Sequence, residues 1–124
     1  MTMINSHKFL KSVLDTVTQH IAVIDGDGQI VYVNKSWITF GQSNSCCIDI
    51  KWEMINYLNE CDKAASNGDE FGTKAAEGIR DVINGTRDSF YFEYPCHSPY
   101  EKRWFMMRVK PFKLGETDFY VICT

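Results

Sequence analysis

The spacing of hydrophobic and polar residues predicts a helix followed by a β-hairpin at the start of the chain. Over residues 6–19, hydrophobic side chains recur at helical spacing, which predicts an amphipathic helix with Ser6 as its N-cap. Two β-rich runs follow, Ile21–Ile24 and Ile30–Val33, and the turn sequence Asp-Gly-Asp-Gly separates them. Asn34 comes next, and we expect it to cap a short helix that presents Trp37 and Phe40 on one side.

The middle of the chain is predicted to be helical after a polar loop. This loop covers residues 42–51, and weak helical periodicity returns over residues 52–65. Stronger periodicity over residues 71–84 predicts an amphipathic helix that ends at Asn84-Gly85. Gly72 and Gly78 interrupt that helix, each at a cost of about 1 kcal/mol, unless a close approach of backbone or ligand compensates.

The last third of the chain alternates as β-strands do. Residues 88–112 predict two long strands joined by a proline-bounded turn, and residues 118–124 predict one more strand. The strands before and after the helices have no core of their own, so the two halves must join in one antiparallel sheet. The pattern therefore predicts an α+β fold.

Composition limits the size and the partners of this protein. Its 124 residues fit one domain, and its net charge of −3 does not favour nucleic acid or an anionic membrane. The apolar runs are too short to span a bilayer, and the N-terminus lacks the pattern of a secretory signal. The five cysteines are odd in number and irregular in spacing, which indicates reduced thiols in a cytoplasmic protein.

Four stretches of the chain resemble the PAS sensory domain found in bacterial histidine kinases and GGDEF (diguanylate cyclase) signalling proteins: AVIDGDGQIVYVN, NYLNECDKAA, EGIRDVINGTRDSFYFEYPCHSPYEKRWFMMRV and FYVICT. The resemblance covers roughly residues 6–124. It implies a five-stranded antiparallel sheet that holds a ligand against short helices on one face, usually in a dimer that drives an output domain. We therefore expect residues 1–19 to form a flanking helix and residues 20–124 to form the PAS domain, with the output domain outside this chain.

The same resemblance bears on cofactors. Photosensory flavin-binding PAS domains need a cysteine directly after an asparagine; here Asn56 matches that asparagine, but Tyr57 occupies the cysteine position. Haem-binding PAS domains use a histidine in the longer helix, and residues 71–84 contain none. We therefore expect neither a covalent flavin nor haem. Cys96 and His97 are adjacent on a predicted strand and point to opposite faces, so no metal site is expected there.

No pattern in the sequence indicates an enzyme. The chain has no recognisable nucleophile–base pair, phosphate-binding glycine loop or carboxylate cluster. Residues 67–71, Asn-Gly-Asp-Glu-Phe, look like the GGDEF motif of diguanylate cyclases, but acidic residues also favour the first turn of a helix, which is our interpretation here.

The faces of the two long strands differ in how well the sequence determines them. In residues 103–111 the uncharged set, Phe105, Met107 and Val109, is predicted to point inward. In residues 88–94 two alternatives stay open. Simple alternation points Phe90, Phe92 and Tyr94 inward, whereas the pairing of flavin-binding relatives points Tyr91 and Glu93 inward. A buried Glu93 would need Arg103 or Arg108 as a partner.

We expect a small organic molecule as the ligand, in a cavity between the sheet and the helices. The candidate ligand-binding residues are Asn34, Trp37, Phe40, Asn56, Tyr57, Ile79, Ile83, Phe92, Glu93, Phe105 and Met107. The alternative is a ligand-free module for dimerisation or protein docking. In either case the expected homodimer contact is the N-terminal helix together with the outer face of the sheet.

Overall fold

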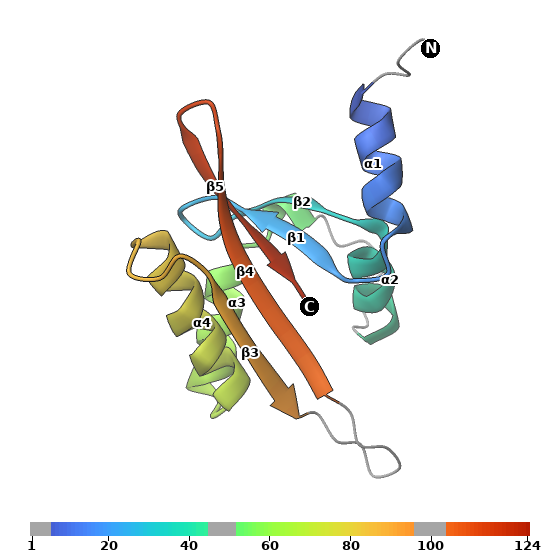
Figure 1. Cartoon of the computed structure of the whole chain (residues 1–124). Helices are drawn as coiled ribbons and strands as arrows, with labels where there is room; N and C mark the ends of the chain where they lie inside the picture. The colour runs from blue at the N-terminus through green and yellow to red at the C-terminus, as the bar shows by residue number, and fades with distance from the viewer. Residues whose placement is uncertain (1–5, 45–51, 96–103) are drawn as a thin grey trace.

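The computed structural model describes residues 6–44, 52–95 and 104–124, and within them the order of elements matches the predicted order (Figure 1). The N-terminal part contains α1 (Ser6–Thr16), β1 (Ile21–Ile24), β2 (Ile30–Val33) and α2 (Lys35–Asn44). The central part contains η1 (Trp52–Met54), α3 (Tyr57–Ser66) and α4 (Glu70–Ile83). The C-terminal part contains β3 (Phe90–Pro95), β4 (Trp104–Leu114) and β5 (Thr117–Cys123).

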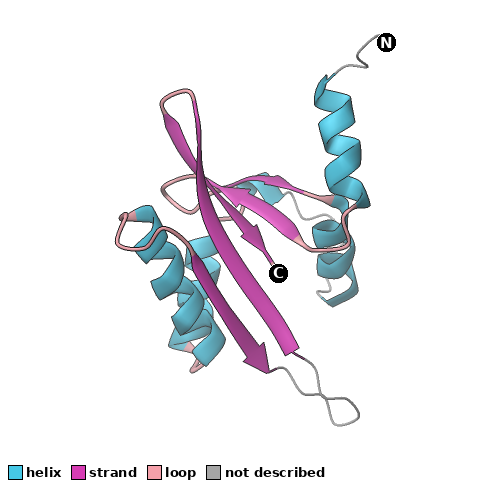
Figure 2. Ribbon diagram, in the orientation of Figure 1, coloured by secondary structure: helices cyan, strands magenta, loops and turns pink. Residues whose placement is uncertain are grey.

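The strands of the described residues form one five-stranded antiparallel sheet in the order β2-β1-β5-β4-β3 (Figure 2). The central strand β5 joins the N-terminal hairpin to the C-terminal one, since Ile122 lies opposite Ala22 on β1 and opposite Val109 on β4. The predicted α+β fold, with helices on one face of a five-stranded sheet, is confirmed.

The face of the sheet that packs on α3 and α4 forms the hydrophobic core. Met107 and Val109 of β4 are fully buried there, whereas Met106 and Arg108 are exposed on the other face, as the alternation predicted. Phe90 and Phe92 lie opposite Val109 and Met107, so they point inward as well. The open question about residues 88–94 is thus settled for Phe90 and Phe92 by the register of β3 on β4.

Both glycines within α4 lie where the helix approaches its neighbours closely. A Cβ atom at Gly78 would overlap the ring of Phe90 on β3, and one at Gly72 would be 2.7 Å from the backbone oxygen of Cys61 on α3. The helix-propensity cost of the glycines is therefore offset by tight packing of α4 on the sheet and on α3.

The helix α1 is shorter than the periodicity suggested. It ends at Thr16, although the hydrophobic pattern continues through Val17, so the prediction of a helix to residue 19 was wrong by three residues. Three β-branched residues in a row, Thr16 to Thr18, are poor helix formers. The helix α1 projects away from the sheet, and the turn end of the β4–β5 hairpin extends beyond the other strands (Figure 1).

Replacement of Gly72 by alanine tests the close approach of α3 and α4. Because the new methyl group would contact backbone atoms that cannot rotate away, we expect Gly72→Ala to lower the free energy of unfolding by about 1–3 kcal/mol. Urea denaturation measures this change. Gly26→Ala is the matched control, since nothing lies within 4 Å of its Cβ position, and an equal loss in both variants would contradict the explanation.

Candidate functional site

Three aromatic side chains from three different elements form a cluster on the helical side of the molecule. The ring of Trp37 on α2 lies 5.9 Å from that of Trp52 on η1, nearly perpendicular to it, and 5.8 Å from that of Tyr57 on α3. Trp52 and Tyr57 also pack against the hydrophobic core. Edge-to-face and tilted contacts of this kind are favourable, and together the rings offer flat apolar surfaces.

The indole nitrogen of Trp37 is the unusual atom of this cluster. Its Nε1–H is buried and has no hydrogen-bond partner among the residues that the structure describes. Buried donors in proteins are almost always paired, because an unpaired one loses its hydrogen bonds to water without replacement. The cluster therefore contains a donor that a hydrogen-bond acceptor would stabilise.

Tyr57 is paired differently, with the thiol of Cys61 one helical turn later. Burial raises the pKa of Cys61 to about 12, and Asp62 adds to this shift. Burial also raises the pKa of Tyr57. Both groups are thus neutral at physiological pH, and the Cys61 thiol has none of the thiolate character that covalent chemistry requires.

The protonated state of Cys61 can be tested by alkylation. Because its folded-state pKa is about 12, iodoacetamide at pH 8 should modify Cys61 only as fast as the domain unfolds. Peptide mass spectrometry measures the rate at this residue, and the same experiment in 8 M urea is the control. Fast labelling of the folded protein at Cys61 would contradict the buried environment.

The raised pKa of Cys61 also predicts a dependence of stability on pH. The unfolded chain begins to lose this proton near the ordinary value of 9.0, whereas the folded chain keeps it until about pH 12. Stability from this group is therefore complete below pH 9 and falls as the pH rises from 9 to 12. Urea denaturation at pH 8 and pH 10 should show a smaller loss for Cys61→Ala than for the original chain.

The other predicted residues of the interior are distributed along the core. Ile79 and Met107 are fully buried, and Ile83 and Phe92 are partly buried against the core. Phe92 stacks obliquely on Phe71, with 5.4 Å between the ring centroids. Phe40 and Phe105 lie on α2 and β4, but their side chains lie outside the described residues. Trp52 was not predicted, because it follows a loop whose sequence has no clear period.

The two asparagines proposed to orient a ligand are instead committed to the fold. Asn34 is fully buried, and its side chain makes four hydrogen bonds within the chain. Asn56 caps α3 by accepting from the N–H of Asn59, and it donates to the carbonyl of Asp27 in the turn between β1 and β2. The prediction that Asn34 contacts a ligand does not fit its four bonds. For Asn56, whose two bonds leave part of its capacity unused, contact with a ligand stays a prediction.

Glu93 lies on the outer face of the sheet, so the alternative that placed Tyr91 and Glu93 inside is wrong. The hydroxyl of Tyr91 donates to Glu93 Oε1 at 2.9 Å, and the guanidinium of Arg108 stacks over the Tyr91 ring at 5.2 Å. An exposed carboxylate of this kind needs no buried partner. Sequence alternation alone would have given the correct face.

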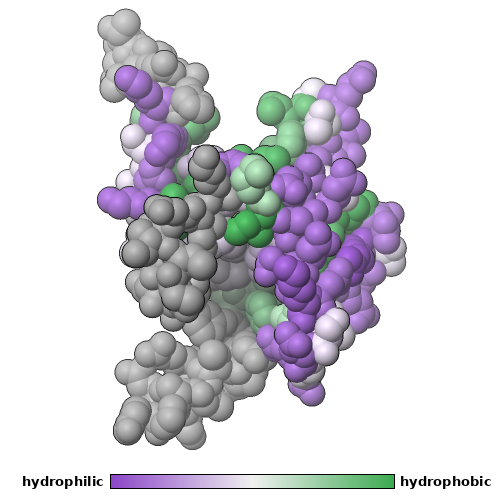
Figure 3. All heavy atoms as spheres, turned by 180° about the vertical axis from the view of Figure 1, so that it is seen from behind, coloured by the Kyte–Doolittle hydropathy of each residue, from purple (hydrophilic) through white to green (hydrophobic). Residues whose placement is uncertain are grey.

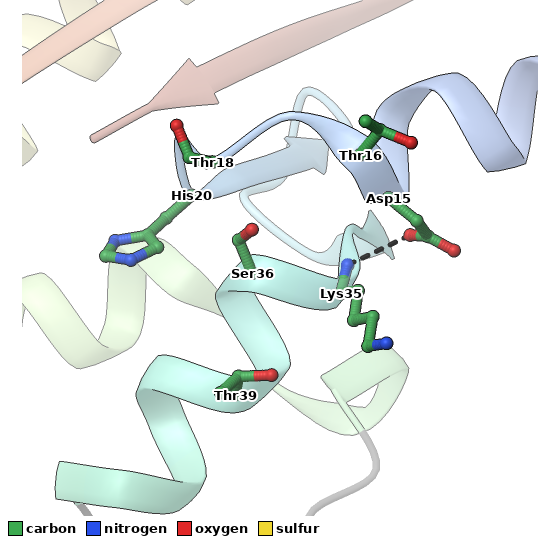
Figure 4. Close-up of a pocket in the computed structure, with 7 residues that line it drawn as sticks. All are labelled: Asp15, Thr16, Thr18, His20, Lys35, Ser36 and Thr39. Atoms are coloured by element: carbon green, nitrogen blue, oxygen red, sulfur yellow. Dashed lines mark hydrogen bonds between the residues drawn. The ribbon is translucent and has the colours of Figure 1, made fainter.

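A polar pocket of about 560 Å³ lies between the end of α1 and the start of α2 (Figure 4). It is lined by Asp15, Thr16, Thr18, His20, Lys35, Ser36 and Thr39. Asp15 accepts a hydrogen bond from the backbone N–H of Lys35 at 3.0 Å, so its carboxylate already occupies the N-terminus of α2. The hydrogen bond from Lys11 lowers the pKa of Asp15.

A hydrophobic groove of about 570 Å³ separates α1 from the hairpin of β4 and β5. One wall contains Leu10, Lys11 and Leu14, the other contains Phe112, Leu114 and Phe119, and the remaining lining residues are Val23, Val31, Tyr32 and Glu53. Hydrophobic residues face each other across this gap in the space-filling view (Figure 3). Phe112 and Phe119 stack at 5.5 Å, which gives the second wall a flat apolar surface.

The described part of the chain contains no group of three or more His, Cys, Asp or Glu side chains arranged to hold a metal ion. Within the same residues, every helix is too short or too polar to cross a bilayer.

Comparison with other proteins supports the architecture rather than a specific activity. No protein-family profile matches the chain. An uncharacterized 104.1 kDa protein from the hypE 3′ region of Rhodobacter capsulatus is 34% identical over 113 residues, which are 90% of this chain and 12% of that protein. The chain thus spans about an eighth of the length of this relative.

Solved structures resemble the chain over nearly its whole length. The PAS domain of Bordetella pertussis BvgS superposes with a TM-score of 0.61 at 11% identity, covering 97% of this chain and 85% of that domain. A PAS domain from Colwellia psychrerythraea gives 0.57 at 17% identity, covering 97% and 96%. The photoactive yellow protein domain of the sensor histidine kinase Ppr from Rhodospirillum centenum gives 0.57 at 15% identity, covering 91% and 97%. The chain therefore has the PAS fold.

Proposed function

We propose that this chain is the sensory domain of a signalling protein and that it binds a small planar molecule beside Trp37, Trp52 and Tyr57. The observation that supports this most is the buried Nε1–H of Trp37, which lacks a partner among the described residues of an otherwise apolar cluster. A ligand with a flat apolar body and one hydrogen-bond acceptor matches this combination.

The chemistry of the cluster narrows the expected ligand. Tyr57 and Cys61 are neutral and hydrogen-bonded to each other, so they offer no charge to a ligand. Charged groups on the ligand would pay a large desolvation cost in such surroundings. A neutral carbonyl-bearing or heteroaromatic compound fits better than a carboxylate or a phosphate. Binding would regulate an output domain only as far as the ligand prefers one of two conformations.

Replacement of Trp37 by phenylalanine tests the role of its indole nitrogen. A ligand present at 100 times its dissociation constant should raise stability by about 2.7 kcal/mol, which a thermal-shift assay with neutral acceptor-bearing heteroaromatic compounds such as quinoline and quinolone detects. Trp37→Phe keeps an aromatic ring but removes the donor, so we expect about tenfold weaker binding.

Trp52→Phe is the matched control, because it replaces a neighbouring indole of the same cluster by the smaller phenyl ring and leaves the Trp37 donor in place. Native mass spectrometry of the freshly purified protein adds an independent measurement, since a co-purified molecule would add its mass. Equal affinity of Trp37→Phe and the original chain would contradict a hydrogen bond to Trp37. An absence of stabilisation and of added mass would contradict the ligand itself.

A second candidate function is dimerisation, and the exposed hydrophobic surface of α1 favours it. Phe9, Leu10 and Val13 are 56%, 58% and 46% exposed, and Leu114 on the facing hairpin is 69% exposed. Hydrophobic surfaces of this extent mark interaction sites. A second copy fits best as the partner, because one chain carries both an apolar helix face and an apolar groove, and a two-fold arrangement would bury both patches on each copy.

Introduction of a charge on this surface tests the homodimer. Val13→Asp would place a carboxylate in the proposed interface, so we expect light scattering to report twice the mass of one chain for the original protein and the mass of one chain for the variant. Ser12→Asp is the control, since it adds the same charge to a non-hydrophobic position of the same helix. Identical masses for all three proteins at one concentration would contradict an interface through α1.

Together, the proposals of ligand binding and dimerisation assign a role to each of the two parts of the chain. Residues 1–19 would act as a flanking helix for dimerisation, and residues 20–124 as the sensory domain of a longer cytoplasmic protein. The free thiols of Cys61 and Cys123 support a reducing compartment. The much greater length of the Rhodobacter capsulatus relative supports a larger protein in which an output domain accompanies this one.

A further inference from the structure

We infer that Asn34 couples the helix that carries Trp37 to the N-terminal helix α1, so that a displacement of α2 at the proposed ligand site changes how α1 is held. The inference rests on the proposed sensory function and names the residue through which that function would reach the interface helix. It replaces the role in ligand orientation that the sequence suggested for Asn34.

The four hydrogen bonds of the Asn34 side chain join three separate elements. Its Nδ2 donates to the carbonyl of Leu14 in α1 and to that of Gln19 in the following linker, each at 3.0 Å. Its Oδ1 accepts from the N–H of Ile21 in β1 and from the N–H of Trp37 in α2, also at 3.0 Å each. An amide side chain has two donor hydrogens and an acceptor oxygen with two lone pairs, so its whole capacity is used.

Burial makes these bonds consequential. Asn34 is fully buried, so water cannot replace a partner that moves away. A shift of α2 that keeps the bond to Trp37 must therefore move the amide relative to Leu14 or Gln19, or leave a buried polar group unpaired. Asn34 thus links Trp37, whose indole N–H lacks a partner among the described residues, to the end of α1.

Two neighbouring hydrogen bonds also hold the end of α1 and the linker after it to the start of α2. Lys35 donates its backbone N–H to Asp15 at 3.0 Å (Figure 4). The hydroxyl of Ser36 donates to the carbonyl of Val17 at 2.7 Å. These contacts and that of Asn34 all come from residues 34–36, at the start of α2. The end of α1 is therefore held by the start of the helix that carries Trp37.

The linker after α1 also contacts the end of the central strand β5. The backbone of His20, in the linker after α1, exchanges two hydrogen bonds with Thr124 directly after β5, at 3.1 Å and 2.9 Å. A change in the linker would thus be transmitted to the end of β5 as well as to α1. Thr124 directly follows Cys123, which lies opposite Ile21 where β5 pairs with β1.

A double-mutant cycle on the full chain tests the coupling without any ligand. Trp37→Leu perturbs α2 at the proposed site, and the backbone amide resonances of residues 8–16, measured by NMR, report the state of α1. We expect Trp37→Leu to shift these resonances and to raise the amide exchange rates of α1 about tenfold. In an Asn34→Asp background the same substitution should have little further effect.

The choice of Asn34→Asp isolates the connection to α1. Aspartate keeps the oxygen that caps α2 but loses the Nδ2 donor to Leu14 and Gln19. Asn56→Asp is the matched control, because Asn56 also caps a helix and donates to a carbonyl, but its partner Asp27 is in the turn between β1 and β2. In this control the response of α1 to Trp37→Leu should persist.

Retained amide protection of β4 and β5 shows that each variant is folded. If Asn34→Asp does not fold, Ser36→Ala removes a single bond to Val17, directly after α1, and should reduce the response partially. An equal response of α1 with and without Asn34, or no response to Trp37→Leu in the original chain, would overturn the inference. These outcomes are independent of ligand binding: the thermal-shift assay can fail while the coupling is observed, and the reverse also holds.

Discussion

The pairing of β5 with both β1 and β4 is the interaction on which the rest of the structure depends. Each of the two hairpins exposes a hydrophobic face that it cannot bury alone. Ile122 is fully buried because it lies between Ala22 and Val109 from the two halves of the chain. The strand β5 therefore completes the core, because it joins the two halves of the chain in one continuous surface against which the helices pack.

Local signals in the sequence were sufficient for most of the architecture. The Asp-Gly-Asp-Gly turn and the two glycine-containing boundaries of α4 predicted where elements begin and end, since such residues act within a few positions. The sequence also showed which face of β4 is buried, because charges there alternate with apolar residues. Its description of β3 remained ambiguous, because that strand has large side chains on both faces and only its register on β4 distinguishes them.

Long-range hydrogen bonds were the part that the sequence could not reveal. Asn34 was predicted to cap a helix, and it does so, but its donors reach residues 15 and 20 positions away along the chain. A polar residue near a predicted pocket therefore looked available to a ligand, while the fold had already used it. Trp52 was missed for a related reason: its neighbours Trp37 and Tyr57 come from elements that only the tertiary structure brings together.

The buried thiol of Cys61 has a consequence for the covalent reactivity of this domain. Peroxides and other oxidants react with thiolates, and a thiol with a pKa of about 12 has almost none at neutral pH. Burial keeps this thiol protonated even though the hydrogen bond from Tyr57 acts in the opposite direction. Oxidation or alkylation at this position therefore requires that the thiol first be exposed to solvent, so modification of Cys61 would report a local opening of the core.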